Sequence, residues 1–312
     1  MLSFARVSII GMGLIGSSLA RAIRVRMPTV RLSVSDSSAD VRARVEALGL
    51  ADDVCDLPAT AVIDAELVIL CVPVGAMGAV AAEIADDLAE GAVVTDVGSV
   101  KASVLAALTA ALPAHVHVVP GHPVAGTERS GPDSGFATLF EGRWCILTPQ
   151  QPGPASRQLQ AFWERLGAKV ELMDAAHHDR VLAVTSHLPH LIAYSIVGTA
   201  SDLETVTRSE VIKYSAGGFR DFTRIAASDP VMWRDVFLTN REAVLETLGR
   251  FTEDLVALQR AIRWGEGDTL EALFTRTRAI RRSIIDEGQD TEAEDFGRPH
   301  GPPAEPADED PR

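Results

Sequence analysis

The sequence is poor in cysteine, in long hydrophobic runs and in positive charge. Its 312 residues include three cysteines, Cys55, Cys71 and Cys145, which lie far apart and form no CxxC pair. This spacing argues against a disulfide framework and against a zinc site, and it suits a reducing compartment. The cysteines therefore predict a cytoplasmic protein with no metal.

The apolar run at residues 67–82 is interrupted by Pro73, Gly75 and Gly78 and is shorter than the ~20 residues that cross a bilayer. A buried strand is expected from about Ala5, which leaves no room ahead of it for a signal peptide. We therefore expect neither export nor a membrane span.

Basic residues are too few to attract nucleic acid. The chain has 29 Lys and Arg against 43 Asp and Glu, and residues 286–312 hold ten of the acids and two of the arginines. The remaining residues carry a net charge of about −6, which excludes an electrostatic footprint for nucleic acid. Residues 286–312 also lack the hydrophobic content needed to fold, so we expect an acidic disordered tail.

A glycine-rich turn follows the first expected strand, residues 5–10. It reads Gly11-Met-Gly13-Leu14-Ile15-Gly16 and leads into a helical pattern, which is the context that binds a dinucleotide pyrophosphate. A second strand, residues 30–35, ends at Asp36, where a carboxylate can accept from both ribose hydroxyls. A glycine turn required only for packing is the alternative. The expected cofactor-binding residues are Gly11, Gly13, Leu14, Ile15, Gly16, Asp36, Val72 and Pro73.

Strands and helices continue to alternate as far as Asp174, which predicts a parallel sheet. Beyond it the apolar residues recur at three- and four-residue spacing, which is typical of helices. The expected fold is therefore α/β, with a Rossmann-type dinucleotide-binding domain at residues 1–174 and an all-α substrate and dimerisation domain at 175–285. The expected strands are 65–72, 92–96, 143–148 and 169–173, and the expected helices are 76–88, 100–112, 155–166, 181–197, 232–258 and 270–285.

Residues 118–131 hold the most promising candidate site. His122 lies between Gly121 and Pro123, directly after an apolar pair, so we expect it to project from the carboxyl end of a strand, where open α/β sheets bind ligands. Glu128 follows in a loop that contains two glycines, and a base and a carboxylate can then face one cavity. A surface turn with a chance histidine is the alternative.

Three further places can carry chemistry. Ser99 can cap the helix expected at 100–112, and a capping hydroxyl can also face a substrate. The segment Ser186-His-Leu-Pro-His190 places two imidazoles on one helical face, but no carboxylate or thiol completes a metal motif, so core or substrate-facing histidines are favoured. Residues 217–225 place Arg220 and Arg224 around Asp221, either as a solvated turn or as a guanidinium fork for a substrate carboxylate.

Five segments together resemble the prephenate/arogenate (cyclohexadienyl) dehydrogenase family. They are Gly-Met-Gly-Leu-Ile-Gly-Ser-Ser-Leu, Asp-Val-Gly-Ser-Val-Lys, Gly-His-Pro-Val-Ala-Gly-Thr-Glu-Arg-Ser-Gly, Thr-Ser-His-Leu-Pro-His and Gly-Gly-Phe-Arg-Asp-Phe-Thr-Arg. The match covers about residues 5–285. It implies tyrosine biosynthesis by NAD(P)-linked oxidative decarboxylation of prephenate or arogenate, and a homodimer formed through the helical domain.

The resemblance also implies roles for single residues. His122 is the base that takes the substrate hydroxyl proton, and Ser99 is its orienting neighbour. Glu128 lies near the substrate side chain. Further residues are expected around the substrate: His190 lining the pocket, Arg224 on the ring carboxylate with Arg220 as a weaker candidate, and Trp233 as a wall.

Two other functions remain open at this stage. A β-hydroxyacid dehydrogenase also joins a Rossmann half to a helical half, but it requires a lysine on the first helix of the second half, and residues 174–198 contain none. A non-enzymatic dinucleotide sensor does not require His122, Ser99 and Arg224 together. A ribose 2′-phosphate beside Asp36 would meet a like charge and no arginine before Arg42, so we expect NAD to be preferred over NADP. NADP remains possible, because the hydroxyls of Ser37 and Ser38 can accommodate a phosphate if the aspartate turns aside.

Overall fold

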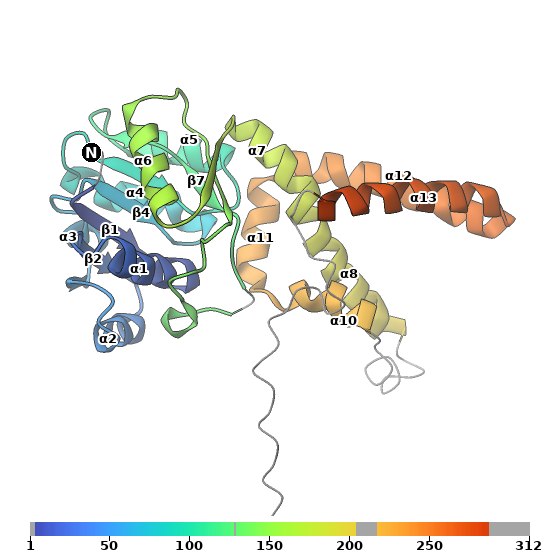
Figure 1. The fold of residues 1–312 in the computed structure, drawn as a ribbon, viewed down its shortest axis with the longest axis horizontal. Helices are drawn as coiled ribbons and strands as arrows, with labels where there is room; N and C mark the ends of the chain where they lie inside the picture. Colours follow the sequence, from blue (N-terminus) through green and yellow to red (C-terminus); the bar gives the residue numbers. More distant parts are fainter. Residues whose placement is uncertain (1–3, 128, 204–216, 287–312) are drawn as a thin grey trace, which may run out of the picture. The chain divides into compact units, whose positions relative to one another are not determined.

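The computed structural model describes residues 4–127, 129–203 and 217–286 (Figure 1). The chain forms two compact units, residues 1–248 and 249–312. The first unit contains both the parallel sheet and the helices up to the first turns of α12, so the predicted division at residue 174 remains a prediction. Glu128 and the predicted tail, apart from Asp286, lie outside the described residues.

Six parallel strands form the main sheet in the order β3-β2-β1-β4-β5-β6, which is the order of a Rossmann fold. The central strands β1, β4 and β5 are almost wholly buried because both faces of the sheet are covered there, as expected for a parallel sheet. Their registers align Ile10, Leu70 and Asp96 at one edge, so the carboxyl ends of β1, β4 and β5 meet there. The strands are β1 (Arg6–Ile10), β2 (Arg31–Ser35), β3 (Asp53–Cys55), β4 (Leu67–Leu70), β5 (Val93–Asp96) and β6 (His117–Val118).

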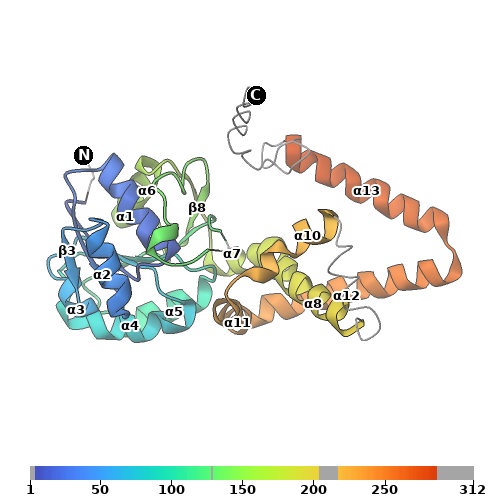
Figure 2. The ribbon, with the colours of Figure 1, turned by 90° about the horizontal axis from the view of Figure 1, so that it is seen from below.

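Helices cover the two faces of the sheet (Figures 1 and 2). Successive residues of β1 point to opposite faces: Ile9 packs in the core under α1 and α6, and Ile10 packs in the core under α4 and α5. This alternation explains why the strands read as continuous apolar runs. The helices are α1 (Leu14–Arg26), α2 (Ala39–Ala47), α3 (Pro58–Ala61), α4 (Met77–Ile84), α5 (Ala102–Ala111) and α6 (Pro154–Arg165).

A second sheet of three strands corrects the expectation of one continuous sheet. It consists of β7 (Gly121–Pro123), β8 (Trp144–Leu147) and β9 (Lys169–Leu172), with β7 antiparallel to β8 and β8 parallel to β9. The parallel strand β6 ends at Val118, so His122 does not project from it. Instead, His122 lies in the middle of β7, paired with Ile146.

A run of helix follows β9. It begins with α7 (Ala175–Leu182), passes through a π-helical turn (Ala183–His187) and continues as α8 (Leu188–Leu203). Pro189 cannot donate a backbone hydrogen bond, and π turns occur frequently at functional sites. By length and composition alone, residues 175–202 could also cross a membrane, which is weak evidence because core helices pass the same test.

The remaining described helices are α10 (Gly217–Thr223), a 3-10 turn (Arg224–Ala227), α11 (Pro230–Thr239), α12 (Arg241–Trp264) and α13 (Gly267–Asp286). The single helix expected at 232–258 is in fact two. Asn240 ends α11 with a non-helical conformation, and its side chain turns inward to a buried site. The polar contacts of that side chain account for the break.

Candidate active site

The glycine turn between β1 and α1 is shaped for a close approach of a ligand. A Cβ on Gly16 would lie 2.0 Å from the carbonyl oxygen of Gly11, and one on Gly11, where φ is +97°, would lie 2.7 Å from that of Cys71. Gly13 differs, because a Cβ there would meet nothing within 4 Å. Two glycines are therefore required by packing and the third leaves open space, as expected where a pyrophosphate meets the backbone.

The helix behind this turn has room for an anion. Gly13 caps α1 without a side-chain hydrogen bond, so the first amides of the helix at Leu14 and Ile15 are not capped by a side chain. Uncapped amides and the helix dipole favour a negative group at this end. The neighbouring strand β4 continues into Val72 and Pro73, and the Val72 side chain lies 3.2 Å from the Cβ position of Gly11. The turn and this segment thus fit a dinucleotide.

Asp36 directly follows β2, as expected, and its carboxylate is oriented by two backbone amides. Met12 donates to one oxygen at 2.8 Å and Ser38 donates to the other at 2.9 Å. The structure adds Arg42, whose guanidinium donates to the carbonyl oxygens of Asp36 and Ser37 and pairs with an exposed aspartate. The arginine that appeared distant in sequence therefore touches the turn expected to bind the ribose.

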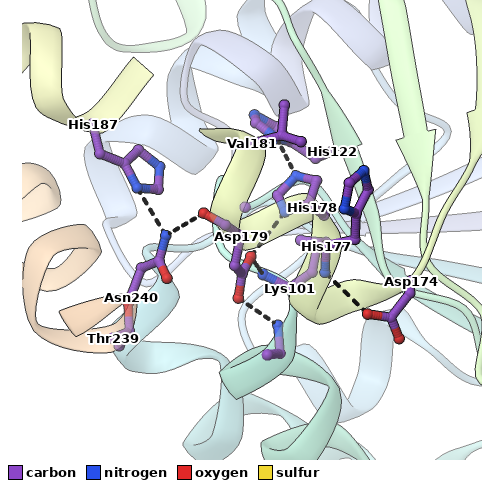
Figure 3. A network of polar contacts seen from close by, with 12 residues as sticks. Lys101, His122, Asp174, His177, His178, Asp179, Val181, His187, Thr239 and Asn240 are labelled. Atoms are coloured by element: carbon purple, nitrogen blue, oxygen red, sulfur yellow. Dashed lines mark hydrogen bonds and ion pairs between the residues drawn. The ribbon is translucent and has the colours of Figure 1, made fainter. Parts of the chain in front are cut away.

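His122 begins a chain of three buried polar side chains (Figure 3). Its Nδ1 atom lies 2.8 Å from Nε2 of His178, and Nδ1 of His178 lies 2.8 Å from an Asp179 carboxylate oxygen. All three side chains are buried. Neither His178 nor Asp179 was assigned a role from the sequence. We call His122, His178 and Asp179 the relay.

The relay fixes the tautomers of both histidines. A carboxylate only accepts, so Nδ1 of His178 donates to Asp179 and its Nε2 atom accepts in the neutral ring. His122 must then donate from Nδ1, which leaves its own Nε2 atom with a free lone pair. The result is a neutral imidazole whose Nε2 atom has no hydrogen-bond partner among the residues that the structure describes, which is the arrangement that a general base requires.

The surroundings keep these imidazoles neutral. Burial lowers the pKa of His122 well below its usual value, and the positive charge of Lys101 and the neighbouring His178 act in the same direction. Burial also lowers the pKa of His178, while the hydrogen bond to Asp179 opposes this shift. At neutral pH both rings are therefore uncharged and His122 can accept a proton.

Asp179 has a second function, which corrects the prediction for Ser99. Helix α5 begins at Ala102 with Lys101 as its N-cap, so Ser99 does not cap it. The two oxygens of Asp179 accept instead from the amides of Lys101 and Ala102, at 2.7 and 2.9 Å. A carboxylate at a helix N-terminus is stabilised in its charged form. Ser99 lies half-buried in the loop before this helix.

A second group of predicted residues gathers around Trp233. The ring of His190 stacks on the Trp233 indole, with centroids 3.6 Å apart. Burial lowers the pKa of His190, the hydrogen bond to Ser186 raises it, and the positive charge of Arg224 lowers it. The Arg224 guanidinium therefore lies near the imidazole. The structure therefore brings His190, Trp233 and Arg224 together. Arg220 lies one turn earlier, exposed on α10.

His187 links this group to the relay. Burial lowers its pKa to about 4. Asn240 donates from Nδ2 to the backbone carbonyl oxygen of Asp179 at 2.9 Å, and its Nδ2 atom lies 3.1 Å from Nδ1 of His187. Because the Asp179 carbonyl can only accept, it fixes the orientation of the Asn240 side-chain amide. The His187 ring also packs edge-on against Trp233. Asn240 carried no recognisable signal in the sequence.

Metal chemistry has no geometric basis in the part of the chain that the structure describes. No group of three or more His, Cys, Asp or Glu side chains there could hold a metal ion. Cys55, Cys71 and Cys145 are free thiols. Burial raises the pKa of Cys145 well above its usual value, which keeps that thiol protonated and unreactive.

Comparisons with known proteins agree with this geometry. Residues 19–172 match the family model "Prephenate dehydrogenase, nucleotide-binding domain", and residues 174–276 match "Prephenate dehydrogenase, dimerization domain". A cyclohexadienyl dehydrogenase of Zymomonas mobilis is 47% identical over 283 residues, which cover 90% of this chain and 96% of that protein. A prephenate dehydrogenase of Bacillus subtilis is 36% identical over 267 residues, 85% of this chain and 71% of that protein.

A solved structure indicates the same family. The crystal structure of prephenate dehydrogenase from A. aeolicus in complex with hydroxyphenyl propionate and NAD+ superposes with a TM-score of 0.84 at 33% identity, and covers 90% of this chain and 99% of that chain. The fold, the glycine turn after β1 and the buried neutral imidazole near the carboxyl end of β5 are those of an NAD-dependent dehydrogenase. The chain belongs to the prephenate dehydrogenase family. The predicted family and fold class are thereby confirmed.

Proposed function

We propose that this enzyme catalyses the oxidative decarboxylation of prephenate, arogenate or both, to 4-hydroxyphenylpyruvate or tyrosine, in tyrosine biosynthesis. The observation that carries the proposal is the relay at the same edge of the main sheet as the glycine turn, in a chain 47% identical to a cyclohexadienyl dehydrogenase. The cofactor is NAD, which when bound supplies the hydride acceptor. The A. aeolicus relative was solved with NAD+ and hydroxyphenyl propionate.

The relay explains the first step. The substrate hydroxyl donates its proton to Nε2 of His122 while hydride leaves the ring carbon, so a ketone forms. The resulting imidazolium is stabilised through His178 by the negative charge of Asp179, as in other base-and-orienter pairs. The ketone facilitates loss of the carboxylate as CO2, and the ring becomes aromatic. Its phenolate oxygen then takes the proton back from His122, so the base is regenerated.

The Trp233 group fits the other end of the substrate. Arg224 is the proposed partner of the ring carboxylate, and Arg220 is the weaker candidate. His190 and Trp233 present a stacked apolar face suited to a six-membered ring. Ser99 is the proposed neighbour that orients the substrate hydroxyl toward His122. Glu128, proposed to lie near the substrate side chain, is outside the described residues.

The enzyme is further proposed to act as a homodimer through its helical domain, in the cytoplasm. The matched dimerization-domain family supports the dimer. The helical region of the first unit also exposes large apolar side chains such as Ile196, Val197 and Leu238. Light scattering coupled to size-exclusion chromatography measures the state directly, and a monomer at micromolar concentration contradicts the proposal.

A turnover assay tests the reaction. NADH production is measured with prephenate and with arogenate, each with NAD and NADP, and CO2 release is measured in parallel. The proposal expects NADH and CO2 in equal amounts with at least one of the two substrates. NADH formed without CO2, or only from a simple β-hydroxyacid, contradicts it. The ratio between the two substrates decides which one is preferred.

A further inference from the structure

Lys101 has a side chain that is fully buried, which is rare for lysine. Its Nζ atom forms an ion pair with Asp96, also fully buried, and donates to the carbonyl oxygen of Gly121 at 2.6 Å. The proposed reaction steps use neither group. A buried ion pair is weak evidence for stability, because removing two charges from water often costs more than their attraction returns. The pair therefore suggests a role in the site.

The contacts of Lys101 reach both ends of the relay. Its ammonium holds the carbonyl oxygen of Gly121, the residue immediately before His122. Its backbone amide donates to a carboxylate oxygen of Asp179 at 2.7 Å. One residue thus fixes both the strand that carries the base and the carboxylate that orients His178.

Asp96 completes the support of the strand. Strand β7 lies at the edge of its sheet and pairs with β8 alone, so one side of β7 has no strand neighbour. On β7, both backbone groups of Gly121 are met by the ion pair: its amide donates to Asp96 at 3.2 Å and its carbonyl accepts from Lys101. Unpaired buried backbone groups are costly, so the pair fixes this short strand where a neighbouring strand otherwise would.

We propose that Lys101 is a positioning residue, which together with Asp96 sets the separation of His122 and Asp179 and so keeps the relay aligned for proton transfer. This inference rests on the proposed role of His122 as the base. Because Lys101 touches no reacting atom, its loss acts through the geometry and the charge around His122.

The positive charge of Lys101 can be followed through the pKa of His122. A purely structural role of Lys101 would leave this pKa unchanged. The groups that influence His122 are His178 on α7, His187 in the π turn, and Lys101 before α5, and each lowers its pKa in addition to burial. Cys145, on the neighbouring strand β8, stays uncharged because burial raises its pKa. Asp96 is not among the groups that shift this pKa, so removing both charges of the ion pair raises the pKa of His122.

The test uses a double variant, Asp96→Asn with Lys101→Met. Lys101→Met alone leaves a buried carboxylate without its ammonium, which is strongly destabilising. The double variant removes both charges and keeps similar volumes. Lys169→Met is the matched control, since Lys169 is exposed on β9. Circular dichroism and thermal unfolding establish that each variant is folded.

We expect the folded double variant to bind NAD within about threefold of wild type, since the glycine turn is untouched, and to lose about 10- to 100-fold in kcat from misalignment of the base. The acidic limb of its pH–rate profile moves to higher pH. Lys169→Met changes neither. A double variant with kcat within threefold of wild type and an unmoved acidic limb overturns the proposal.

Two measurements do not depend on turnover, so they separate this inference from the proposed reaction. Histidine-selective NMR labelling follows the titration of His122, assigned with His122→Asn, and the same upward shift is expected in the double variant even if the substrate is a different one. In wild type, the Nζ protons of Lys101 should exchange far more slowly with water than those of Lys169. Equal exchange rates overturn the proposal, whether or not the variants fold.

Discussion

The glycine turn and the relay lie along the same edge of the main sheet but are built in opposite ways. The turn uses backbone amides, and the space above Gly13 is open. The relay uses side chains, all buried and joined by hydrogen bonds. A site that binds an anion needs exposed donors, whereas a base that must stay neutral needs to be withdrawn from water. The contrast shows how one sheet edge can supply both requirements of a dehydrogenase.

The largest effect is expected when the proposed base of the relay is replaced. His122→Asn keeps the fold and cofactor binding but lowers kcat by roughly 10²–10⁴, the usual worth of a positioned general base. His177→Asn, at an exposed histidine nearby, is the control and should keep full activity. Steady-state kinetics with the preferred substrate check both. Near-normal kcat in His122→Asn removes the base assignment.

Low pH should lower the free energy of unfolding, because the buried His187 beside the relay must then take up a proton. The pKa of His187 is about 4 in the folded chain and near 6.5 when unfolded, so its contribution is present above pH 6.5 and is lost as the pH falls toward 4. This amounts to about 3 kcal/mol for His187 alone, because each pKa unit is worth about 1.4 kcal/mol. Urea unfolding at pH 7.5 and pH 5 should measure about 2 kcal/mol of this loss, because pH 5 lies between the two pKa values. A free energy of unfolding equal at both values contradicts the assignment.

The substrate group around Trp233 is tested by Arg224→Ala. Loss of a charged hydrogen bond to the ring carboxylate is worth about 1.5–3 kcal/mol, so KM should rise about 10- to 100-fold. Arg220→Ala is the comparison and should have a smaller effect. If KM and kcat are both unchanged in Arg224→Ala, the guanidinium belongs to a solvated turn.

Two alanine substitutions test the packing and the cofactor contact of the glycine turn separately. Gly16→Ala places a Cβ 2.0 Å from the carbonyl oxygen of Gly11 and should cost about 1–3 kcal/mol of folding stability, as overpacked sites do. The Cβ of Gly13→Ala meets no atom of the described residues within 4 Å, so the fold should be unaffected while the KM for NAD rises about tenfold. Thermal unfolding and cofactor titration separate the two effects. An unchanged KM in Gly13→Ala places the pyrophosphate elsewhere.

The smallest expected effect concerns the choice of cofactor. Wild type should favour NAD, because a ribose 2′-phosphate would meet the like charge of Asp36. Asp36→Ser should reduce the NAD to NADP ratio of kcat/KM by several-fold, about 1 kcal/mol, since Arg42 already lies at this turn. A wild-type ratio that favours NADP means that Asp36 does not face the ribose.

The sequence by itself determined the parts that depend on neighbours along the chain. The glycine turn, the strand that ends before Asp36 and the helical pattern after residue 174 are local signals, because each requires consecutive residues at fixed spacing. The five motifs were sufficient for the family. His122 was also identified from its motif, although its strand was misassigned.

The tertiary structure alone decided what surrounds those motifs. The contact of Asp179 with the amides that begin α5 spans 77 and 78 residues, and the contact of Asn240 with Asp179 spans 61. Nothing local distinguishes a capping carboxylate supplied from another helix from an ordinary exposed one, so the sequence assigned the cap of α5 to Ser99. The protonation state of a buried imidazole depends on which charges the fold brings around it, and that information is not present in the order of the residues.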